Sequence, residues 1–79
     1  MKDISIRNIR KLAKQYLKTE KNKQRALELA WNDEMQRLFK LGKFSSKSWH
    51  EIIRGDRPPK WINVWDLKLD VNSGKIKKR

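Results

Sequence analysis

Residues 45–54 combine an apolar face with side chains that can bind bases and phosphates. Laid out as a helix, the segment presents two faces of opposite character. The apolar face consists of Trp49, Ile52 and Ile53, and the polar face consists of Lys47, His50, Glu51 and Arg54. A helix that reads DNA needs this division, because one face anchors it and the other presents donors and acceptors to base edges.

The polar residues each suit a particular contact with DNA. Lys47 and Arg54 can donate to N7 and O6 of guanine, and Glu51 can accept from N4 of cytosine. His50 fits either a polar residue on the surface of the helix or a residue that contacts a base edge. Three further residues at the two ends of the segment suit phosphate, and these are Ser45, Ser46 and Arg57. An ordinary amphipathic surface helix would carry the same pattern, so the segment alone leaves both interpretations open.

The charge of the chain indicates a polyanionic partner. The 79 residues hold 21 Lys+Arg and nine Asp+Glu, which gives a formal charge of +12. The excess is uneven, since residues 1–25 contain nine basic and only two acidic residues. Clustered positive charge favours nucleic acid, because binding releases condensed counterions. A lysine-rich surface that only keeps the protein in solution is the alternative.

The N-terminal segment predicts an amphipathic helix with a basic face. Apolar residues recur with helical spacing between Ile6 and Leu17, and Asp3 or Ser5 can cap the helix. The opposite face carries a basic stripe, with one member at its edge: Arg7, Arg10, Lys11, Lys14 and Lys18. This stripe fits a solvated face and a phosphate-contacting face equally well.

A second helical pattern follows a polar turn in which Thr19 or Asn22 can act as the cap. It runs to Leu41, and Gly42 fits the position after the C-cap. The pattern allows one long helix or two. We favour a break at 32–33, with Asp33 capping a separate helix over 34–41, because Asn and Asp favour caps over helix interiors.

The C-terminal part predicts a short helix at 59–64 and a small hairpin at 65–77. Apolar and charged residues alternate over 65–71, and Asn72-Ser73-Gly74 is typical of a turn. Such a hairpin must pack on the helices to be stable. We therefore expect a mainly α, single domain over residues 1–79, with a helix-turn-helix and a short C-terminal β-hairpin.

The composition argues against an enzyme, a cofactor protein and a membrane protein. The chain has no Cys, a single His and no Gly-rich phosphate loop, so we expect no catalytic, cofactor or metal site. No apolar run approaches the ~20 residues of a membrane span, and the N-terminus lacks a signal-peptide pattern. We expect a cytoplasmic protein.

Residues 33–77 resemble known DNA-binding proteins. The run 52–59, with Gly55 and Pro58-Pro59, resembles the end of the helix-turn-helix in repressors of the lambda-repressor (Cro/Xre) type. Residues 38–42 look like the preceding helix and its glycine turn. The pattern Trp61…Trp65-Asp66-Leu67…Gly74-Lys75-Ile76 is similar to the Trp-rich tail of small phage-encoded helix-turn-helix proteins.

The resemblance implies a phage- or plasmid-type regulator that reads double-stranded DNA through a helix-turn-helix at 34–54. Such proteins often dimerise, and the Trp-rich end offers an interface, although nothing in the sequence requires one. Two alternatives remain open. An RNA-binding or ribosome-associated module would use an exposed aromatic for stacking, for which Trp61 is the candidate. A small protein that inhibits an acidic host protein would also carry a basic face.

Overall fold

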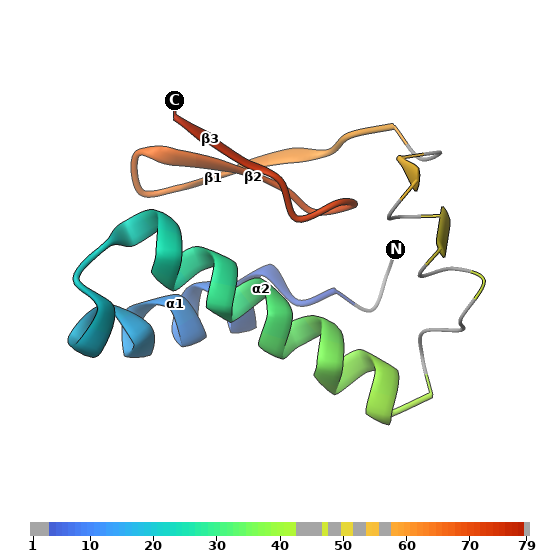
Figure 1. The fold of residues 1–79 in the computed structure, drawn as a ribbon, viewed down its shortest axis with the longest axis horizontal. Coiled ribbons are helices and arrows are strands. Elements are labelled where there is room, and N and C mark those ends of the chain that lie inside the picture. The colour runs from blue at the N-terminus through green and yellow to red at the C-terminus, as the bar shows by residue number, and fades with distance from the viewer. Residues whose placement is uncertain (1–3, 43–46, 48–49, 52–53, 56–57, 79) are drawn as a thin grey trace.

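The computed structural model describes residues 4–42, 47, 50–51, 54–55 and 58–78. Two helices, α1 (Ile6–Glu20) and α2 (Lys23–Lys40), precede three strands, β1 (Trp61–Val64), β2 (Leu67–Asp70) and β3 (Ile76–Lys78). The strands form one antiparallel sheet in the order β1-β2-β3. Both helices lie on the same side of this sheet (Figure 1).

The start of each helix follows from the capping chemistry of the sequence. The Ser5 hydroxyl accepts a hydrogen bond from the backbone N–H of Asn8 at 3.1 Å and begins α1. The side chain of Asn22 accepts from the N–H of Arg25 at 3.1 Å and begins α2. Ser5 and Asn22 are therefore confirmed as caps. Gly42 follows the C-cap of α2 with a φ of +72°, as expected of a glycine at that position.

The predicted break at 32–33 is wrong, because α2 continues without interruption through these residues. The Asp33 carboxylate accepts a hydrogen bond from the Tyr16 hydroxyl on α1, and it caps no helix. On either side, the buried side chains of Trp31 and Met35 hold α2 in the core. Tertiary packing therefore outweighs the weak local preference of Asn32-Asp33 against a helix interior.

The predicted helix at 59–64 is also wrong, because Trp61–Val64 forms strand β1. β1 pairs with β2 in a register that places Trp61 opposite Asp70 and Val64 opposite Leu67. The spacing of the apolar residues in this segment predicted a helix, but pairing with β2 makes it a strand. Its β-branched and aromatic residues suit a strand. The hairpin predicted for 65–77 is confirmed in β2 and β3, with Leu69 opposite Ile76.

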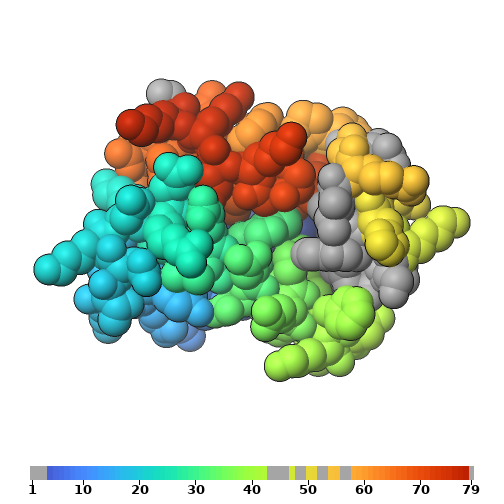
Figure 2. Space-filling model, in the orientation of Figure 1, coloured from blue at the N-terminus to red at the C-terminus, as the bar shows by residue number. Residues whose placement is uncertain are grey.

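The core lies between the two helices and the inner face of the sheet. α1 contributes Ile9 and Ala13, and both are fully buried. The remaining members come from α2 and the strands: Leu27, Ala30, Trp31, Met35, Leu38, Val64, Leu67 and Leu69. Figure 2 shows α2 between the strands and the visible part of α1 on this face. The side of α1 opposite Ile9 and Ala13 lies outside this core.

Candidate nucleic-acid interface

The basic residues of α1 form an exposed surface, as the sequence predicts. Arg7, Arg10, Lys11, Lys14 and Lys18 are all exposed. On the opposite side of the helix, Ile9 and Ala13 have no exposed surface. The helical phase inferred from the sequence is therefore confirmed, and we call these five residues the α1 basic face.

The α1 basic face has no acidic partner among the described residues. Two exposed ion pairs have their basic member on α2, where Asp66 lies 3.2 Å from Lys23 and Glu28 lies 3.4 Å from Arg25. Glu34 likewise binds a residue of α2, Arg37. The charge of α2 is thus partly balanced within the fold, whereas the charge of α1 faces solvent.

Arg10 connects the α1 basic face to the sheet. Its guanidinium Nη2 donates a hydrogen bond to the backbone carbonyl of Asn63 at 3.1 Å. Asn63 lies on β1, an edge strand, so this bond satisfies a carbonyl at the open edge of the sheet. The same arginine borders a shallow depression of about 550 Å³ on α1, whose described lining is Ile6, Arg7, Arg10, Lys11 and Lys14.

The DNA-reading helix predicted for residues 45–54 is described only in part. Lys47, His50, Glu51 and Arg54 have helical backbone, which agrees with a helix over these positions. Lys47, His50 and Arg54 are exposed, and Glu51 is half-buried. The other predicted members lie outside the described residues, namely Ser45, Ser46, Trp49, Ile52, Ile53 and Arg57.

The buried carboxylate of Glu34, which sequence analysis did not single out, holds the N-terminal end of α1 in place. Glu34 on α2 has no exposed surface and accepts from the N–H of Ser5 and from the Asn8 amide, each at 2.8 Å. Arg37 donates two more hydrogen bonds to this carboxylate, from Nε to Oε1 at 2.7 Å and from Nη2 to Oε2 at 2.9 Å. Burial alone would raise the pKa of Glu34, but the hydrogen bonds from Arg37, Asn8 and Ser5 outweigh it and hold the pKa below its ordinary value. This network positions the first turn of α1, where Arg7 begins the basic face.

A second buried carboxylate, Asp70, organises the turn after β2. It accepts from the backbone N–H groups of Lys60 at 3.2 Å and Asn72 at 3.0 Å, and from the Ser73 hydroxyl at 2.6 Å. Burial would raise the pKa of Asp70, but the bonds from Ser73, Asn72 and Lys60 hold it below its ordinary value. Its oxygens are therefore engaged by the fold.

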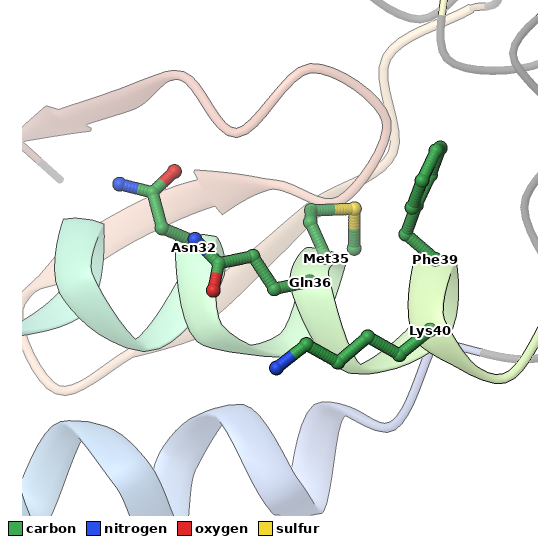
Figure 3. A pocket seen from close by; sticks show the side chains of 5 residues that line it. All are labelled: Asn32, Met35, Gln36, Phe39 and Lys40. Atoms are coloured by element: carbon green, nitrogen blue, oxygen red, sulfur yellow. The ribbon is translucent and has the colours of Figure 1, made fainter.

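A groove of about 390 Å³ lies along α2 (Figure 3), and its described lining is Asn32, Met35, Gln36, Phe39 and Lys40. Phe39 is 55% exposed beside it. The lining offers apolar contact, two amides and one ammonium, but no carboxylate. This composition suits contact with another surface better than binding of a cation.

The described residues show neither a metal-binding cluster nor a membrane-crossing helix. No group of three or more His, Cys, Asp or Glu side chains in this part of the chain is placed to hold a metal ion. Neither α1 nor α2 is apolar enough over sufficient length to cross a bilayer. Comparison of the chain with family models, with curated proteins and with solved structures finds no match.

Proposed function

We propose that this protein binds nucleic acid, with double-stranded DNA as its principal target. The observation that carries the proposal is the α1 basic face, whose exposed cations have no acidic partner among the described residues. Such an arrangement leaves charge repulsion within the free protein, and phosphates relieve it. Each phosphate that is neutralised also releases condensed counterions.

The dimensions of the α1 basic face suit a phosphate backbone. At about 1.5 Å per residue, the stretch from Arg7 to Lys18 spans roughly 16 Å. That length corresponds to about five base-pair steps of ~3.4 Å, so several phosphates lie within reach. Because the face belongs to a regular helix packed on the core through Ile9 and Ala13, its charges are held in a fixed arrangement.

The second part of the proposal is that residues 45–54 read the base sequence. Lys47, His50 and Arg54 are helical and exposed, and their spacing of three and four residues places them on one face of a helix. The C-terminal half of α2 would then be the first helix of the helix-turn-helix, with Gly42 in the turn. The resemblance to repressors supports a role in transcriptional regulation.

We expect Lys47→Ala and Arg54→Ala to reduce sequence preference more than general affinity. A side chain that contacts a base edge contributes roughly 1–3 kcal/mol on the preferred site and much less on random duplex. A preferred duplex is first selected from a random pool, and both variants are then titrated against it and against random duplex. Lys40→Ala, which removes an exposed cation at the end of α2, is the control.

If the variants lose equal affinity for the preferred and the random duplex, these residues do not read the base sequence. Selection that finds no preferred duplex would have the same consequence. Stronger binding of structured RNA than of duplex DNA would replace the DNA proposal with the RNA-binding alternative.

A further inference from the structure

The outer face of the sheet is a second basic surface, separate from α1. Strand residues alternate between faces, so Ile62, Val64, Leu67 and Leu69 point toward the helices. The pairing register then places five polar or aromatic residues on the outer face: Trp61, Asn63, Lys68, Asp70 and Lys77. Both helices lie on the inner side of the sheet, so neither covers this face (Figure 1).

Positive charge dominates this face and its borders. Lys68 and Lys77 are directly opposite each other on neighbouring strands, a placement in which like charges repel. Lys60, Lys75 and Lys78 are exposed at the ends of the strands. Asp70 occurs among them, but its carboxylate is buried and takes hydrogen bonds from Lys60, Asn72 and Ser73. The face therefore complements an anion.

Trp61 provides an aromatic surface among these lysines. The residue is 37% exposed, and the Lys77 ammonium lies 4.2 Å from the ring centroid. An exposed cation–π contact changes an equilibrium by only about 2- to 5-fold. Stacking of a nucleic-acid base on an aromatic side chain contributes more, about 5- to 150-fold in affinity. A base can therefore displace the ammonium, which is then available to a phosphate.

We propose that the outer face of the sheet binds single-stranded DNA, with one base stacked on Trp61 and the adjoining phosphates on Lys68 and Lys77. Bases are accessible for stacking in single strands but not inside a duplex, so the partner is a strand that has left the double helix. The choice of DNA rests on the function proposed for α1, whose face continues to the edge of β1 through the bond from Arg10 to Asn63.

Trp61 and Lys77 have different expected effects, and this difference tests the proposal. Binding of a fluorescein-labelled oligothymidylate of about ten nucleotides is followed by anisotropy over a range of salt concentrations. Trp61→Leu should weaken binding about 5- to 150-fold with an unchanged salt slope, since stacking releases no counterions. Trp61→Phe should retain most of the affinity. Lys77→Gln should lower the slope by about 0.7 through the loss of one phosphate contact.

An oligomer with the same phosphates but abasic sugars isolates the stacking contribution. The unaltered protein should bind it more weakly than oligothymidylate, whereas Trp61→Leu should bind the two oligomers alike. Trp61→Phe is the matched control, because it keeps an aromatic ring at the same position of the sheet. Thermal unfolding of each variant confirms that the fold is retained.

The results distinguish this proposal from the function proposed for α1. If Trp61→Leu and Trp61→Phe bind oligothymidylate equally well, the sheet is not a stacking surface, whatever the affinity of α1 for duplex. If duplex binding is absent but the Trp61 effect appears, the α1 proposal fails and the sheet proposal stands. An oligouridylate that binds more than tenfold tighter than the deoxy oligomer would overturn the assignment to DNA.

Discussion

Replacing Gly74 with alanine is expected to destabilise the protein by roughly 2–5 kcal/mol, which is comparable to the whole stability of a small domain. A Cβ at this position would lie 2.3 Å from Nε1 of Trp31 and 2.6 Å from its Cε2. Trp31 is only 6% exposed and cannot move away without opening the core. Gly74 also has a φ of +76°, a conformation that alanine adopts at a cost. Thermal unfolding should show a decrease in Tm of at least about 10 °C.

Gly42→Ala separates the clash with Trp31 from the cost of the positive φ. Gly42 has a nearly equal φ of +72°, but an added Cβ would meet no atom within 4 Å. This variant should therefore lose only the backbone contribution, about 1–2 kcal/mol. Equal losses in Gly42→Ala and Gly74→Ala would show that the turn does not press against Trp31.

The second large effect is expected from Glu34→Gln, at roughly 3 kcal/mol of stability. The carboxylate of Glu34 accepts from Ser5, Asn8 and Arg37, whereas the amide of glutamine would place an NH₂ group against some of these donors. Donors at the start of α1 would lose their acceptor inside the fold. Denaturant titration of the variant should show a lower midpoint with a similar slope.

Glu28→Gln is the control on the same helix. Glu28 pairs with Arg25 at 3.4 Å, and its side chain is 41% exposed. Pairs of this kind contribute about 0.2–1 kcal/mol. If Glu28→Gln costs as much as Glu34→Gln, the buried network contributes no more than a surface ion pair.

The Glu34 network also predicts how stability depends on pH. Because the folded protein lowers the pKa of Glu34 from its ordinary value of 4.5, the ionised form stabilises the fold. This contribution is complete above the ordinary value and is lost as the pH falls through the lower value in the folded protein. Asp70 acts in the same direction below 3.8. The acid decline in stability should therefore be shallower in Glu34→Gln, and an unchanged profile would contradict the assignment.

The sequence predicted the elements that depend on local chemistry. The caps at Ser5 and Asn22 are signals within one helical turn, and the amphipathic pattern of residues 6–17 lies within a single helix. The structure confirms both. The turn at Asn72-Ser73-Gly74 was predicted for the same reason. The α1 basic face followed directly from the helical phase, since the positions opposite buried Ile9 must face solvent.

The errors arose where distant residues decide the structure. Asp33 is held within α2 partly by a hydrogen bond from Tyr16 on α1, and residues 61–64 form a strand because β2 pairs with them. Neither partner can be identified from local spacing. The role of Glu34 was missed because a single glutamate on a helix is usually exposed. Asp70 carried a usable signal, since an Asp two residues before Asn72 often accepts its N–H.

The central claim is that the α1 basic face contacts phosphates, and the dependence of duplex binding on salt tests it most directly. Two triple variants remove the same net charge. One changes to glutamine three cations of α1 that have no acidic partner among the described residues, Arg7, Lys11 and Lys14. The other changes the cation at the C-cap of α1 and two exposed cations in the first turn of α2 that are already paired with carboxylates, Lys21, Lys23 and Arg25.

At about 0.9 per phosphate contact, the α1 variant should lower the slope of log affinity against log salt by about 2–3, and the α2 variant should change it little. Affinity for a duplex of random sequence, measured by anisotropy between low and moderate salt, gives both slopes. Equal slopes for the two variants would show that only total charge matters. An unchanged slope in the α1 variant would show that this helix does not contact DNA.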